Sequence, residues 1–180
     1  MKLDRRELLR KVGLGSIALA SLPTLANAMA KSAEAAGQTN FTFVVVSKRV
    51  GHSDLITFDG CGGFNRSEVV GGGSFTWFIP PPPNGPIVSS GTWKAGRLLK
   101  FSPGGTFGTG EGGVLDLEVR LVQTFPSSAV IPATLRVVCT IGDTTGGLPE
   151  GIILTLGSGI KFEPIDLGIT IFTAGNDREG

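Results

Sequence analysis

The stretch VGHSDLITFDGCGGF, at 50–64, contains the only histidine of the chain, His52, and one of its two cysteines, Cys61. A cysteine and a histidine in hydrogen-bond contact form a nucleophilic pair, and both residue types bind metals. The β-branched run between them predicts a strand at 54–58, which would separate the two side chains by roughly 15–25 Å. We therefore interpret the stretch as a strand between two turns, with His52 exposed in the first turn and Cys61 in the second.

Metal and cofactor chemistry has few candidate ligands in this sequence. One histidine and two cysteines are too few for a blue-copper site, which uses two histidines and a cysteine, or for an iron–sulfur cluster, which uses four thiolates. The nucleophile motif G-x-S-x-G does not occur. The sequence predicts no catalytic residue set, no metal and no cofactor.

A candidate ligand site lies in the segment GTWKAGRLLKF, which combines Trp93 with Lys94, Arg97 and Lys100. An aromatic ring beside cations can hold an acidic or sugar-like ligand. The cations do not follow the two-residue period of a strand, so a regular strand would divide them between its faces unless Gly96 forms a bulge. We take Trp93, Lys94 and Arg97 as the candidate ligand contacts. The default interpretation is a half-buried tryptophan flanked by solvated lysines.

The glycine-rich segment GTGEGG, at 108–113, has the G-x-G-x-x-G spacing of dinucleotide-binding loops. Such a loop must lie between a strand and a helix, whose N-terminus faces the pyrophosphate. A two-faced strand follows here instead, so we predict a hairpin loop. The segment is also similar to the glycine-rich strand turn of dirigent-like and allene-oxide-cyclase-like barrels.

Short β-branched runs separated by Gly, Pro and Asp predict an all-β fold, in a chain that has 28 glycines. Strands are expected at 40–48, 54–58, 74–79, 87–94, 97–101, 114–123, 133–141, 152–156 and 169–173. In LDLEVRL and ATLRVVCTI, apolar and polar residues alternate, so one face of each strand is wet. We predict a single antiparallel domain of about eight to nine strands, with a barrel favoured over a two-sheet sandwich because a barrel has no exposed edge.

The first 30 residues have the three parts of an export signal: a basic start, a short apolar run and small residues before a cleavage point. Their core, DRRELLRK, resembles the twin-arginine (Tat) signal. Arg5 and Arg6 match the arginine pair of that motif, and Leu9 matches its leucine. Asp4, Leu8 and Arg10 depart from that pattern. The resemblance implies the Tat translocase as a partner, folding before export, and a periplasmic or extracellular destination.

Cleavage would divide the chain into a signal at 1–28 (or 1–30), a polar leader at 29–39, the all-β domain at 40–174 and a flexible tail at 175–180. The whole chain carries 16 Lys and Arg against 15 Asp and Glu, and the signal is rich in the former. The remainder is therefore weakly acidic, which gives no reason to expect nucleic acid as a partner. No segment after the signal is long and apolar enough for an integral membrane helix.

The two cysteines differ in their predicted surroundings. Cys139 shares the apolar face of its strand with Leu135 and Val137, so we expect it to be buried, whereas Cys61 should be accessible. A disulfide between them stays open as an alternative, since the destination is oxidising but folding before export is not.

The sequence leaves three hypotheses about function open. We favour a binding or structural domain of the cell envelope, with a small-molecule or envelope ligand. The alternative is a cyclase- or isomerase-like barrel enzyme for a small apolar substrate, which calls for a carboxylate or an arginine inside the barrel. A third reading is envelope assembly by strand addition, with the polar leader as the donor strand. The charges of the two clearest strands all fall on the polar face, which favours binding over catalysis.

Overall fold

The structure is a computed structural model, which describes residues 39–80, 85–108, 110–141 and 146–174. The expected signal, most of the leader and the expected tail lie outside these residues. The strands are β1 (Thr39–Arg49), β2 (Leu55–Phe64), β3 (Val69–Phe78), β4 (Ile87–Phe107), β5 (Gly110–Phe125), β6 (Ala129–Cys139), β7 (Gly151–Leu156) and β8 (Lys161–Ala174). No helix among these residues is long and apolar enough to cross a membrane.

The strands form one closed antiparallel barrel in chain order, and β8 pairs with β1 to close it. The prediction of an all-β barrel is therefore confirmed. Eight strands replace the nine expected, because 87–94 and 97–101 belong to a single strand, β4.

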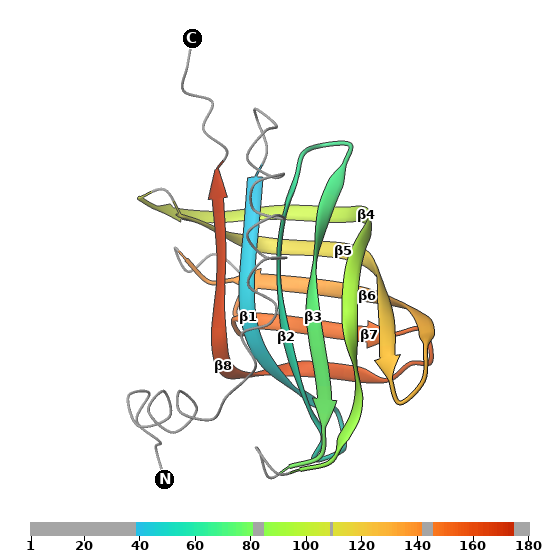
Figure 1. The fold of residues 1–180 in the computed structure, drawn as a ribbon. Helices are drawn as coiled ribbons and strands as arrows, with labels where there is room; N and C mark the ends of the chain where they lie inside the picture. Colours follow the sequence, from blue (N-terminus) through green and yellow to red (C-terminus); the bar gives the residue numbers. More distant parts are fainter. Residues whose placement is uncertain (1–38, 81–84, 109, 142–145, 175–180) are drawn as a thin grey trace, which may run out of the picture.

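The barrel has two crossing layers, with β1, β2 and β3 upright and β5, β6 and β7 running across behind them (Figure 1). β4 belongs to both layers, since it starts beside β3 and then turns to run beside β5. Its register against β5 shifts twice in mid-strand, between Ala95 and Arg97 and between Leu98 and Lys100. Each shift inserts an extra residue, Gly96 or Leu99, and such bulges bend a strand.

The inward side chains fill the barrel with rings. Phe43, Phe58 and Trp93 stack on one another, with centroids 5.5–5.9 Å apart. The alternation expected in LDLEVRL and ATLRVVCTI is confirmed. Ile141 is partly buried against the core, and the other residues of the two apolar faces are buried: Leu115, Leu117, Val119, Leu121, Ala133, Leu135, Val137 and Cys139. Val138, on the other face of β6, is buried as well. Aromatic rings of this size supply most of the apolar area that the core removes from water.

Glycines in β2 and β3 make room for these rings. A Cβ on Gly60 would collide with the indole of Trp93, and one on Gly62 with the ring of Phe41. The segment DGCGG was expected to be a turn, which is wrong: it continues β2 as far as Phe64. Glycine is frequent here because neighbouring large side chains need the space, and not because the chain reverses.

Candidate functional site

Trp93 lies inside the barrel and does not join a surface site. Its side chain is only 1% exposed, and its indole Nε1 donates a hydrogen bond to the backbone oxygen of Asp59 at 2.8 Å. Lys94, the next residue, is exposed on the outer face. The structure therefore does not bring Trp93 together with Lys94 and Arg97, and the expected aromatic platform beside these cations is not formed.

The cations of β4, by contrast, do come together. Lys94, Arg97 and Lys100 are three residues apart, and the extra residues Gly96 and Leu99 convert that spacing into positions opposite Arg120, Glu118 and Asp116 of β5. Those three β5 residues alternate with the buried Leu121, Val119, Leu117 and Leu115 and so point outward. The bulge at Gly96 that the sequence analysis named as a condition is present, with a second one at Leu99. All three cations lie on the outer face.

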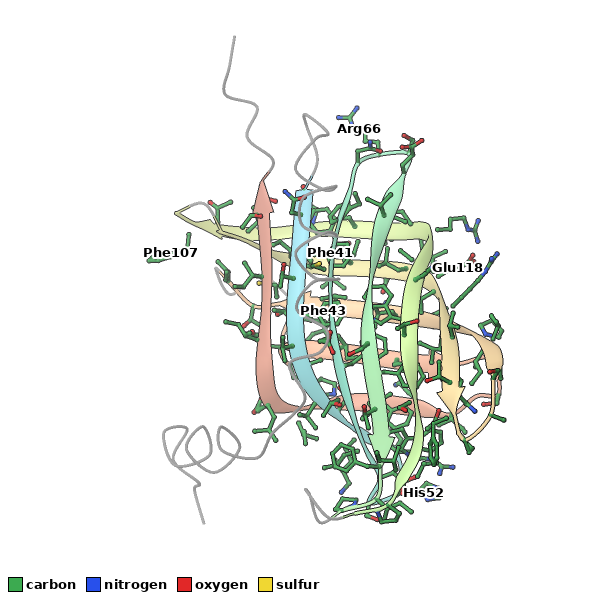
Figure 2. All side chains as sticks on the ribbon, viewed as in Figure 1. Phe41, Phe43, His52, Arg66, Phe107 and Glu118 are labelled. Atoms are coloured by element: carbon green, nitrogen blue, oxygen red, sulfur yellow. The ribbon has the colours of Figure 1, made fainter. Side chains whose placement is uncertain are left out.

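Arg97 and Glu118 form an exposed ion pair across β4 and β5. Nε of Arg97 donates to Oε2 of Glu118 at 3.2 Å, and Nη2 donates to Oε1. The hydrogen bond from Arg97 lowers the pKa of Glu118 below its usual value and raises that of Arg97. Both side chains therefore keep their charge at neutral pH. In Figure 2, Glu118 lies well away from His52, which is at the lower end of the view.

Asp116 lies between two cations. Nε and Nη2 of Arg136 donate to its carboxylate at 2.7 and 3.1 Å, while Lys100 is its partner on β4. The bidentate hydrogen bonds raise the pKa of the Arg136 guanidinium. This geometry orients the Asp116 carboxylate toward β6. The ammonium group of Lys100 is therefore only partly neutralised by that carboxylate.

Lys94 and Arg120 form the remaining cross-strand pair, and both carry positive charge. Both are exposed, and within the described part of the chain neither has an ion-pair partner. Like charges directly opposite one another on a sheet are destabilising. This pair is the one position of the outer β4–β5 face where the sequence sets two cations against each other without a carboxylate.

A groove of about 590 Å³ crosses the outer face beside this pair. It runs over β4, β5, β6 and the end of β7, and its lining is Gly96, Arg97, Glu118, Val119, Arg120, Pro132, Ala133, Thr134, Thr155, Leu156 and Gly157. We call this lining together with Lys94 the outer groove. Its volume is in the range of small-molecule sites. The sequence analysis did not identify Arg120, Thr134 or Thr155 as groove residues. Arg120 and Thr134 could have been found on the polar faces of LDLEVRL and ATLRVVCTI. Their position beside Lys94 depends on how β4 pairs with β5.

His52 lies elsewhere, in the exposed turn after β1, as predicted. Beneath it, Asp54 accepts hydrogen bonds from Nη1 of Arg49 at 3.2 Å and from Nε1 of Trp77 at 3.1 Å. Arg49 also stacks over the Trp77 ring at 5.5 Å. These contacts close one end of the barrel, and we assign them a structural role. No group of three or more His, Cys, Asp or Glu side chains in the described ranges is placed to hold a metal ion.

The cysteines are both free and both buried. The prediction that Cys139 is buried is confirmed, and its Sγ donates to the backbone oxygen of Thr170 at 3.2 Å. The expectation that Cys61 is accessible in a turn is wrong, because Cys61 lies in β2 and is 2% exposed. Burial raises the pKa of its thiol, and the nearby charge of Asp59 raises it further.

The alternative of a barrel enzyme calls for a carboxylate inside the barrel, and we consider the half-buried Glu150 as a candidate for it. It accepts hydrogen bonds from Oγ1 of Thr140 at 2.9 Å and from the backbone N and Oγ1 of Thr170 at 3.0 and 3.3 Å. Its oxygens thus satisfy polar groups of β8 and of the segment after β6. These hydrogen bonds hold the carboxylate in place, and we assign Glu150 a structural role.

Comparison of the chain with protein-family models, with curated protein sequences and with solved structures found no match. We therefore infer the function from the outer groove and from the packing of the barrel.

Proposed function

We propose that this protein is a Tat-exported binding domain of the cell envelope that holds an anionic ligand on its outer β4–β5 face. The observation that carries the proposal is the placement of Lys94, Arg97 and Lys100 on one face by two bulges, with Lys94 directly opposite Arg120. β-Bulges are frequent at functional sites, because they aim side chains in directions that a regular strand forbids.

The charge on this face is unbalanced. Lys94, Arg97, Lys100, Arg120 and Arg136 share it with Asp116 and Glu118, while the remaining cations of the described barrel are Lys48, Arg49, Arg66 and Lys161. A bound anion would relieve the repulsion between Lys94 and Arg120 and use the fork geometry of arginine. That relief is a free-energy gain available only to the bound state.

The packing of the barrel favours a surface function over the alternative of a cyclase- or isomerase-like enzyme. Stacked rings occupy the interior so tightly that Gly60 cannot accept a methyl group. The charged residues Asp116, Glu118 and Arg120 of β5 and Arg136 of β6 lie on the outer face. A substrate site inside would have to displace several of these rings.

Export is proposed on the resemblance of DRRELLRK to the Tat signal, with Arg5, Arg6 and Leu9 as the matching residues. It supplies the periplasmic or extracellular destination.

The binding proposal is tested by titrating the purified barrel with a sulfated dextran of fixed length at several salt concentrations. We expect binding that weakens with salt, and a loss of about tenfold or more in the variant Lys94→Glu/Arg120→Glu, since two favourable charges become two unfavourable ones. The variant Lys48→Glu/Arg66→Glu makes the same change in net charge away from the groove and should retain most of the binding. Equal losses in both variants, or no binding by the unmodified protein, would contradict the proposal.

A further inference from the structure

We infer that the outer groove takes an acidic saccharide, with its anionic group at the β4–β5 end and its hydroxyl groups along β6 and β7. This inference rests on the proposed function and names the ligand class of the same site.

The groove follows a row of side chains that crosses four strands. Arg97 is paired with Glu118, Glu118 with Thr134, and Thr134 with Thr155 in the registers of β4 to β7. At about 4.8 Å between neighbouring strands, the row is about 14 Å long. A ligand that fills it is therefore longer than a single inorganic anion.

The row changes its chemistry along its length. One end is cationic, with Arg97 next to Arg120 and Lys94. The other end presents the hydroxyl groups of Thr134 and Thr155, each of which can donate and accept hydrogen bonds. A matching ligand carries negative charge at one end and neutral hydrogen-bonding groups at the other.

Glu118 restricts the ligand further. Its carboxylate lies in the middle of the row. Arg97 lowers its pKa further below neutral, so the group is ionised at neutral pH. An ionised carboxylate can only accept hydrogen bonds. A ligand with anionic groups throughout would bring one of them against this carboxylate. A ligand with hydroxyl donors at this point would gain a charge-assisted hydrogen bond instead.

The groove is unsuited to nucleic acid. Its lining includes no aromatic side chain, and Trp93, on the neighbouring part of β4, is directed into the core. Proteins that bind single-stranded nucleic acid stack the bases on exposed rings. Pro132 and Gly157 give the groove an apolar wall that a sugar ring can lie against.

The test is a calorimetric titration of the full barrel with four probes that separate these features. Maltotrionate carries hydroxyls and a single carboxylate at one end, maltotriose hydroxyls alone, tripolyphosphate charge alone, and a short thymidine oligonucleotide charge with bases. We expect maltotrionate to bind most tightly, and the variant Thr134→Val/Thr155→Val to weaken its binding about tenfold while leaving tripolyphosphate unchanged.

A matched control is available in Thr57→Val/Thr76→Val, a directly opposed threonine pair on β2 and β3. It should leave maltotrionate binding unchanged, and Thr134→Ser/Thr155→Ser, which restores the hydroxyls, should recover it. If tripolyphosphate or the oligonucleotide binds as tightly as maltotrionate and the valine pair has no effect, the saccharide assignment is wrong while the anionic site stands. If none of the charged probes binds, the proposed function fails as well.

Discussion

Lys94 and Arg120 are direct cross-strand partners on the outer face of β4 and β5, two exposed cations opposed without a carboxylate between them in the described barrel. The neighbouring rows show what the same two strands do otherwise. Arg97 faces Glu118, and Lys100 faces Asp116. Two rows of this face are therefore balanced in charge, and the third row, beside the groove, is not.

The unbalanced row should cost stability in the free protein. Replacing Lys94 by threonine removes the repulsion with Arg120 and keeps a good strand former, so we expect the free energy of unfolding to rise by about 0.2–1 kcal/mol. Lys100→Thr, which loses a cation opposite Asp116, should not stabilise. Urea melts at low salt measure both. A Lys94→Thr protein less stable than the unmodified one would show that the row is not strained.

The glycines of β2 should resist substitution because of the rings above them. Gly60→Ala places a methyl group against the indole of Trp93 and the backbone oxygen of Gly72, which should cost about 1–3 kcal/mol. Trp93→Phe removes the indole atoms that would collide, so Gly60→Ala should cost less in that background than in the unmodified protein. Thermal melts of the four proteins give the coupling. Strictly additive effects would mean that Trp93 does not occupy this space.

The Cys61 thiol should be slow to react. Burial and the charge of Asp59 raise its pKa, so little thiolate forms near pH 8, and the strand around it limits access. We expect iodoacetamide to label neither cysteine rapidly in the native protein and both at once in urea, as followed by mass spectrometry of peptides.

The raised pKa of the Cys61 thiol also predicts how the free energy of unfolding changes with pH. The folded state holds the Cys61 proton more tightly than the unfolded state, so this contribution is complete below the pKa of the unfolded thiol and is lost as pH rises through the folded value. Stability should fall on that account in alkaline solution. Rapid labelling of Cys61 at pH 8, or a Cys61–Cys139 disulfide in the oxidised protein, would contradict this view of the two sulfurs.

Export should depend on the arginine pair. Changing Arg5 and Arg6 to lysine keeps the charge of the signal but removes the feature by which it resembles Tat substrates. We expect the variant to stay in the cytoplasm, in fractionation experiments that include an unrelated Sec-exported protein as a control. Normal export of the double variant would remove the Tat proposal without affecting the groove.

The sequence was sufficient for the parts of the fold that follow simple alternation. Leu115 to Leu121 and Ala133 to Val137 alternate with polar residues at a period of two, and that period fixes which side faces the core. The same pattern also suits a two-sheet sandwich, and a barrel is favoured because it leaves no strand edge exposed.

Bulges and close packing could not be predicted in the same way. Lys94, Arg97 and Lys100 share a face only because Gly96 and Leu99 are extra residues in the register with β5, and a register is a property of two strands. Likewise, Gly60 belongs to a strand because Trp93, 33 residues later, needs its space. Composition alone assigns such glycines to turns.

The most direct test of the central claim, that ligand binding occurs on the outer face and not inside the barrel, is an amide chemical-shift map of the protein titrated with maltotrionate. The account predicts shifts concentrated at Lys94, Arg97, Arg120, Thr134 and Thr155, with the amides around Phe43, Phe58 and the indole of Trp93 unmoved. Shifts centred on those interior rings, with the outer groove unchanged, would contradict the account and support a substrate site within the barrel.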